Sequence, residues 1–185
     1  QEFERFTTAE GAPPSVTRHQ LPTYNSYDNA VLYNDFVVGS LIKSYAETDP
    51  NGFLIYLADH GEAVFDAPAA SILGRNEASP TSPMYTVPFL LWTSPSWQAE
   101  HPRDLQSMAK RPYSSSHLIH TLSDLAGLSY EGFEPAKSLV SAQFLAAPRW
   151  IGCWPAPMSS STISATSRWP GWGPIRPICA HAIRG

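Results

Sequence analysis

The feature that most constrains the fold is a six-residue apolar run, residues 53–58 (Phe-Leu-Ile-Tyr-Leu-Ala), enclosed by a turn and a charged pair. The preceding residues 49–52, Asp-Pro-Asn-Gly, have the composition of a tight turn. Asp59 and His60 follow the run directly. Six residues are too few for a helix of ordinary length, so the run predicts a strand with apolar layers on both faces.

An amphipathic helix is expected before this strand, over residues 26–46. Apolar side chains recur there at three- and four-residue steps, at Tyr27, Ala30, Val31, Val37, Val38, Leu41, Ile42 and Tyr45. A helix followed by a buried strand is the repeating unit of an α/β sheet. The sequence therefore predicts the α/β fold class.

Further elements are expected downstream. Residues 61–82 are rich in Ala, Ser, Pro, Gly and Asn and predict a long loop at the end of the strand, where α/β proteins usually build their sites. Residues 87–93 predict a second buried strand, and residues 115–128 predict a second amphipathic helix. The apolar side of that helix is expected to consist of Leu118, Ile119, Leu122, Leu125 and Ala126.

Composition indicates one folded unit and argues against some partners. The chain has 185 residues, 43% of them hydrophobic, with a formal net charge of -4. Its basic residues are scattered, so neither nucleic acid nor anionic lipid is an expected partner. No apolar run approaches the roughly 20 residues of a membrane-spanning helix. Cys153 and Cys179 form no C-x-x-C pattern and indicate neither a disulfide scaffold nor a zinc finger.

The two ends of the chain differ from its middle. Residues 1 to about 23 contain three prolines and predict an extended connection over a surface. Residues 153–185 contain no Leu, Val, Phe, Tyr, Asp, Glu, Lys, Asn or Gln. We interpret them as a non-homologous, disordered tail from a reading-frame error. Resequencing the gene tests this, and an intact in-frame tail would contradict it.

The side chains best suited to chemistry are Asp59 and His60, with Glu62 nearby. Carboxylate and imidazole ligands suit zinc or manganese, and a strand end holds them rigidly. By spacing alone, a surface turn or a capping Asp explains the pair equally well. His117 and His120 lie three apart on the predicted helix, where an exposed or core-edge position is the plainer interpretation. Residues 75–77, Arg-Asn-Glu, fit a phosphate contact or, more simply, a solvated loop.

A series of motifs, taken in order, resembles a known family. The motifs are residues 27–35 (Tyr-Asp-Asn-Ala-Val-Leu-Tyr-Asn-Asp), 50–54, 59–62 (Asp-His-Gly-Glu), 74–77, 84–94, 101–104, 118–121 and 123–130. Together they resemble the phosphoethanolamine transferases that modify lipopolysaccharide, within the alkaline phosphatase and sulfatase superfamily. The branch that acts on the core heptose region is the most similar. The resemblance covers residues 20 to about 152.

The resemblance implies that residues 1–152 are the C-terminal part of a sulfatase-like catalytic domain, with part of its sheet flanked by helices. In such enzymes a domain anchored in the bacterial inner membrane faces the periplasm. A metal-activated Thr takes phosphoethanolamine from phosphatidylethanolamine and passes it to lipopolysaccharide. The family's zinc ligands include the Asp and His of Asp-His-Gly-Glu, which are Asp59 and His60 here, while Glu62 is at most a supporting residue.

Departures from the family pattern concern the rest of the site. The nucleophilic Thr, the first acidic ligand and the membrane helices are expected upstream of Gln1, so no catalytic residue is assigned within this chain. Related sequences carry a His in the loop after the motif, where this chain has Ala70. The expected function is therefore that of a transferase fragment, inactive alone. The alternatives are a sulfatase or phosphodiesterase fragment and a non-functional truncated gene product.

Overall fold

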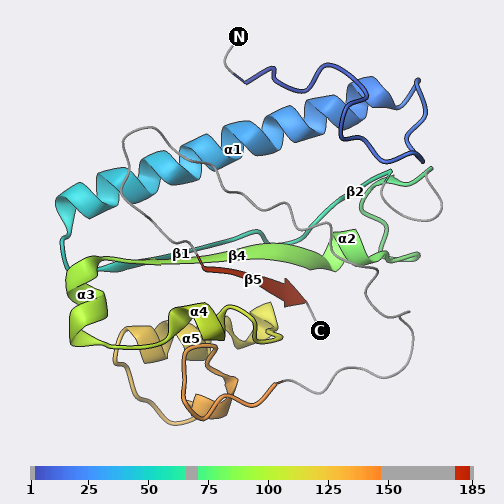
Figure 1. Cartoon of the computed structure of the whole chain (residues 1–185). Coiled ribbons are helices and arrows are strands. Elements are labelled where there is room, and N and C mark those ends of the chain that lie inside the picture. The colour runs from blue at the N-terminus through green and yellow to red at the C-terminus, as the bar shows by residue number, and fades with distance from the viewer. Residues whose placement is uncertain (1–2, 66–70, 147–177, 184–185) are drawn as a thin grey trace.

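A computed structural model shows three layers, with a small sheet between one long helix and several short ones (Figure 1). It describes residues 3–65, 71–146 and 178–183, the last segment by its backbone alone. The sheet order is β1-β4-β5, formed by β1 (Phe53–Leu57), β4 (Thr86–Thr93) and β5 (Ile178–Ile183). The predicted α/β class, a sheet flanked by helices, is confirmed.

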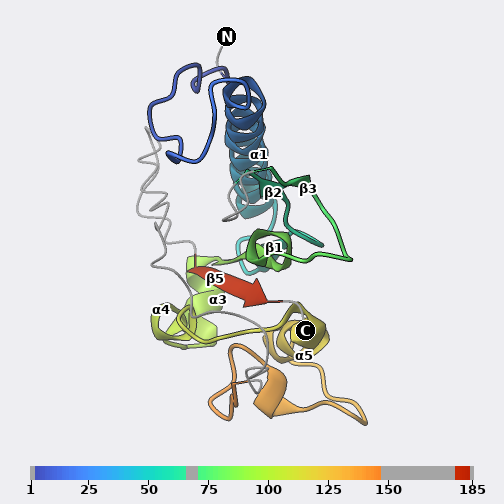
Figure 2. The ribbon, with the colours of Figure 1, turned by 90° about the vertical axis from the view of Figure 1, so that its right-hand side faces the viewer.

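The helices divide between the two faces of this sheet. α1 (Leu21–Thr48) crosses one face, and Figure 2 shows the short helices on the other side. These are α3 (Pro95–Glu100), α4 (Leu105–Met108), the 3-10 helix η1 (Ser115–His117), α5 (Leu118–Leu125) and the 3-10 helix η2 (Pro135–Lys137). At one end of the sheet, β2 (Ala63–Val64) pairs with β3 (Leu73–Gly74), and α2 (Ser82–Tyr85) precedes β4.

α1 is the helix predicted over residues 26–46, extended at both ends. Pro22 lies in its first turn, where a missing N–H costs nothing, and Asp49 ends it by donating its backbone N–H to the Tyr45 carbonyl. Val38 and Ile42 are buried, whereas Val31 and Leu41 are 49% and 58% exposed. The helix rises away from the sheet toward its N-terminal end (Figure 1), where the buried residue is Asn25, which donates to the Thr8 carbonyl of the N-terminal segment.

The N-terminal segment lies along α1 and not along the sheet. Asn29 on α1 binds Phe6 twice, accepting from its backbone N–H at 2.9 Å and donating to its carbonyl at 3.0 Å. The Phe3 ring packs against Tyr33 and Phe36, each with a centroid separation of 5.2 Å. These contacts agree with the surface connection predicted for the first residues.

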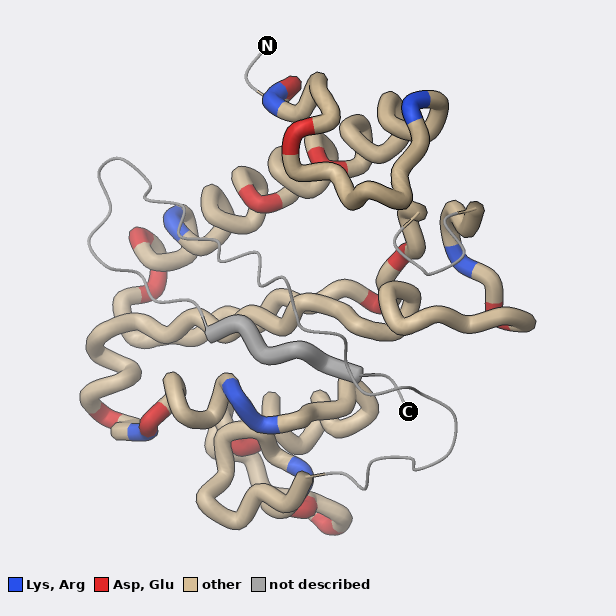
Figure 3. Tube along the Cα trace, turned by 45° about the vertical axis from the view of Figure 1, so that its right-hand side comes forward, with Lys and Arg blue, Asp and Glu red and all other residues tan. Residues whose placement is uncertain are grey.

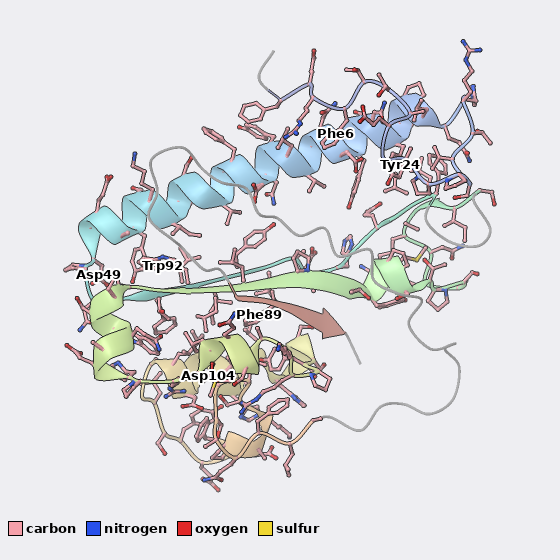
Figure 4. The ribbon with its side chains drawn as sticks, viewed as in Figure 1. Phe6, Tyr24, Asp49, Phe89, Trp92 and Asp104 are labelled. Carbon is pink, nitrogen blue, oxygen red and sulfur yellow. The ribbon has the colours of Figure 1, made fainter. Side chains whose placement is uncertain are left out.

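Both predicted strands are present, and they run antiparallel, with Phe53 opposite Thr93 and Leu57 opposite Phe89. Side chains alternate between the faces. Leu54 and Trp92 pack with Val38 and Ile42 of α1, while Phe53, Phe89 and Leu91 pack with the short helices. Figure 4 shows Trp92 and Phe89 on opposite sides of the ribbon. β1 thus contacts apolar residues on both faces, although its five residues are partly and not fully buried as predicted, and β4 is its single partner strand among the described residues.

The predicted helix over 115–128 is shorter, and its predicted apolar face is confirmed at Leu118 and Leu125 but wrong at Ile119, Leu122 and Ala126. Ile119 and Leu122 are 55% and 41% exposed, whereas His120, Thr121 and Ser123 are buried with Leu125. The polar side is tolerated because its groups are hydrogen-bonded. Thr121 Oγ1 lies 2.8 Å from the Tyr113 hydroxyl and accepts the Leu139 N–H, and His120 Nδ1 accepts the Glu134 N–H at 3.1 Å.

A network of ionic and hydrogen-bonded groups holds the segment after η2 on the face of the sheet that bears the short helices. Arg103 Nη2 lies 3.0 Å from Asp124 Oδ1, and Asp124 Oδ2 accepts the Ser138 hydroxyl at 2.6 Å. Arg111 donates to the carbonyls of Leu139 and Ser141. These bonds hold the segment after η2 against the sheet, where Leu139 is 1% exposed.

The remaining expectations concern loops and the tail. Residues 61–82 contain just the short β2 and β3 and the start of α2 among their described positions, close to the long loop predicted. Ala70 lies outside the described residues, so the question of its missing His is structurally open. Most of residues 153–185 also lies outside them. The described part of that stretch is β5, which pairs antiparallel with β4, and the predicted frame-error tail stays a prediction.

Candidate metal centre

Asp59 and His60 lie just beyond the end of β1, as the sequence predicts. The backbone N–H of His60 donates to Asp59 Oδ1 at 3.0 Å, which holds the carboxylate beside the imidazole. His60 Nε2 then lies 3.7 Å from Asp59 Oδ2. The Asp59 side chain is 85% exposed and that of His60 is 30% exposed, so both side chains reach the surface.

The orientation of the His60 ring is fixed by Gly61. His60 Nδ1 lies 3.0 Å from the Gly61 carbonyl oxygen. A carbonyl oxygen can only accept, so Nδ1 carries the hydrogen in the neutral ring and the lone pair is on Nε2. Metal-ligating histidines commonly donate their other ring N–H to a carbonyl or carboxylate in this way. The ring is therefore set with its acceptor nitrogen toward Asp59.

Gly61 is itself held by a close backbone approach, a feature that the sequence analysis missed. Its N–H donates to the Met84 carbonyl at 3.0 Å. A Cβ atom added at Gly61 would lie 2.0 Å from the Pro83 carbonyl oxygen. Any other residue would have to displace the backbone of α2. The glycine of Asp-His-Gly-Glu is thus required sterically; a glycine beside two candidate ligands was the local signal that could have suggested it.

The geometry of the pair fits half of a metal site. In a tetrahedral zinc site with bonds of about 2.0–2.2 Å, two ligand atoms are roughly 3.4 Å apart. The observed separation of 3.7 Å between Asp59 Oδ2 and His60 Nε2 needs only a small side-chain rotation to match. No group of three His, Cys, Asp or Glu side chains that could hold a metal occurs within the described ranges. A complete site would need ligands beyond these two.

The other candidate residues lie apart from the pair. Glu62 lines a hollow of about 500 Å³ between the start of α1 and the β2–β3 hairpin, with Tyr27 and Leu73. Arg75 is ion-paired with Glu77, which satisfies much of its charge. His117 and His120 lie on the helical side of the sheet, where Lys137 and Glu134 face them. Figure 3 shows Lys and Arg spread over several elements.

The sheet lies between helices, and the candidate ligands Asp59 and His60 follow the end of β1. The family model described as Sulfatase matches residues 1–128, and the chain belongs to this family.

Two similar proteins within this family are phosphoethanolamine transferases. The chain is 58% identical over 143 residues to the phosphoethanolamine transferase EptC of Escherichia coli O18:K1:H7, an alignment that covers 77% of this chain and 25% of that protein. It is 61% identical over 140 residues to the phosphoethanolamine transferase CptA of Salmonella typhimurium, covering 76% of this chain and 24% of that protein. The chain therefore spans about a quarter of the length of these relatives.

Solved structures agree with the fold. The crystal structure of the C-terminal periplasmic domain of EcEptC from Escherichia coli matches with a TM-score of 0.76 and 53% identity, covering 82% of this chain and 43% of that one. The same domain in complex with Zn matches with a TM-score of 0.73 and 54% identity, covering 82% of this chain and 42% of that one. Within the described residues, no helix has the length and apolarity needed to span a bilayer.

Proposed function

We propose that Asp59 and His60 are metal ligands in the catalytic domain of a phosphoethanolamine transferase, with zinc as the metal. The observation that carries the proposal is the orientation of His60, whose Nδ1 is held by the Gly61 carbonyl while Nε2 lies 3.7 Å from Asp59 Oδ2. The names of the relatives at 58% and 61% identity support the activity. The zinc complex of the similar periplasmic domain supports the choice of metal over manganese.

The proposed reaction of the whole protein moves phosphoethanolamine from phosphatidylethanolamine to the core heptose region of lipopolysaccharide, at the periplasmic side of the inner membrane. The bound divalent ion supplies charge neutralisation for the phosphoryl oxygens and lowers the pKa of a coordinated hydroxyl. Asp59 offers an anionic oxygen, and His60 offers a neutral nitrogen whose tautomer is held by Gly61. Neither is the nucleophile, which we assign to the upstream Thr implied by the family resemblance.

A chimera tests the function. The matching segment of E. coli EptC is replaced by the corresponding residues of this chain, and the protein is expressed in cells that lack their own enzyme. Mass spectrometry of lipopolysaccharide is expected to detect added phosphoethanolamine. Asp59→Asn or His60→Gln should lower the addition by roughly 100-fold or more, because a lost ligand costs at least as much as a lost supporting residue. His19→Gln, at an exposed position, is the matched control.

The outcomes separate the alternatives. Full addition by the His60→Gln chimera would contradict the metal assignment. Release of phosphoethanolamine without addition to lipopolysaccharide would favour the hydrolase interpretation. No product from the unsubstituted chimera, rescued by Ala70→His, would show that the loop lacking its His had lost the activity.

A further inference from the structure

The C-terminal ends of three helices meet at one hollow, at the opposite end of β1 from Asp59 and His60. The residues that follow α1, α3 and α5 are Asp49, His101 and Ala126, and all three line a hollow of about 360 Å³. Figure 4 shows Asp49 where α1 ends beside the edge of the sheet. The last carbonyls of each helix have no partner within the helix and give its end a negative partial charge.

A fixed carboxylate adds a full negative charge. Asp49 Oδ1 accepts the Asn51 N–H at 3.0 Å, and Asp49 Oδ2 accepts the Tyr45 hydroxyl at 3.0 Å. That hydrogen bond, with burial and the negative charge of Asp49, raises the pKa of Tyr45, so the phenol stays a neutral donor. Among the described residues that line the hollow, none is Lys or Arg. The carboxylate keeps lone pairs for a further donor.

Aromatic rings also line the hollow. Trp97 is 4% exposed and stacks on His101, with ring centroids 4.5 Å apart and an interplanar angle of 19°. Phe53 meets Trp97 edge-on at 5.7 Å. The His101 Nδ1 lies 3.0 Å from the Trp97 carbonyl, which fixes its ring. Aromatic faces attract organic cations, whereas a small metal ion prefers oxygen ligands and water.

We propose that this hollow binds a small alkylammonium ion. Its N–H groups donate to Asp49, and its alkyl part lies against the aromatic residues that line the hollow, Phe53 and His101 among them. Five residues of β1 separate the hollow from the Asp59 and His60 pair. At about 3.3 Å per residue the gap is roughly 16 Å, so one small ion cannot touch both. The hollow is therefore a second site, independent of the proposed metal centre.

The test is an NMR titration of the 185-residue chain with ethylammonium chloride at pH 8, where an ordinary His is neutral. Ethanol is the neutral probe of similar shape, and sodium chloride matches the ionic strength. Ethylammonium is expected to shift the amide signals of Gly52, Ala126 and Gly127 saturably, and ethanol is expected to leave them in place. Equal shifts with sodium chloride, or no saturable shift, would overturn the proposal.

Two variants make the assignment specific. Asp49→Asn keeps one oxygen that can accept the Asn51 N–H, and its NH2 group can donate to the Tyr45 hydroxyl oxygen. The substitution removes the charge and should weaken ethylammonium binding about tenfold or more. Glu131→Gln removes a charge from an exposed position away from the hollow and should leave binding unchanged. If both variants bind alike, the carboxylate is not the anchor and the proposal fails.

A lysine introduced beside the hollow tests the proposal in a protein that keeps Asp49. Ala126 is exposed and has helical backbone angles, so Ala126→Lys is compatible with the fold. Its ammonium should occupy the hollow and abolish the ethylammonium shifts, whereas Ala126→Gln should retain them. Retained binding in Ala126→Lys at full strength would contradict the proposal.

Discussion

The two faces of the sheet are closed to different degrees. The face with the short helices has a cluster of eight buried apolar residues, whereas the α1 face has three. The difference does not follow from hydrophobicity alone, because α1 carries several apolar side chains that remain exposed. On the first face, ionic and hydrogen-bonded groups hold the segment after η2 against the sheet. On the other face, Val31 and Leu41 of α1 stay exposed. The larger buried cluster is thus the one that polar contacts anchor.

The largest expected difference between the faces is seen by truncating one leucine on each. Leu91 of β4 is 2% exposed on the face with the short helices, and Leu41 on α1 is 58% exposed. Leu91→Ala should lower the free energy of unfolding by about 3 kcal/mol through lost burial and a cavity. Leu41→Ala should change it by no more than about 0.5 kcal/mol. Urea denaturation followed by circular dichroism measures both, and equal losses would refute the comparison.

The ionic anchor should have the next largest effect. Arg103→Ala leaves Asp124 without its partner at a site where the two side chains are 21% and 18% exposed. A loss of about 2 kcal/mol is expected, below that for a fully buried pair because water screens part of the charge. Lys137→Ala removes a more exposed ion pair with Glu134 and should cost about 0.5 kcal/mol or less. An Arg103→Ala protein as stable as Lys137→Ala would show that packing alone holds the segment.

The same contrast explains what could be predicted from the sequence. Apolar periodicity located α1 and the α5 region, and short continuous apolar runs located β1 and β4. Periodicity failed on part of the buried face of α5, since the partners of Thr121 are Tyr113 and Leu139, which lie on other segments. The position of Asp59 and His60 just beyond β1 was predicted from the apolar run before them, and their role as metal ligands stays a prediction. The orientation of His60 was not predicted, because it depends on Gly61 and on the backbone at Pro83, more than 20 residues away.

The smallest expected effect is a pH dependence on the helical face. Burial, followed by the charges of Lys137 and His120, lowers the pKa of His117, and Glu134 opposes them. The unfolded chain therefore binds a proton more readily than the folded one. Stability from this group is present above the ordinary His pKa of about 6.5 and falls as pH drops below it. His117→Asn should flatten that part of the urea-midpoint profile.

The matched control for this profile is His19→Asn, at an exposed position of the N-terminal segment. It should leave the slope below pH of about 6.5 unchanged. An unchanged slope in His117→Asn would mean that other groups account for the acid sensitivity of this face.

The central claim is that the fold holds His60 ready to bind a metal beside Asp59. Long-range proton–nitrogen NMR of the imidazole tests it most directly, first without metal and then with added zinc. The expected spectrum has the hydrogen on Nδ1, and zinc should shift the Nε2 signal, with a loss of that response in Asp59→Asn. A ring with its hydrogen on Nε2, and no zinc-dependent shift, would contradict the claim.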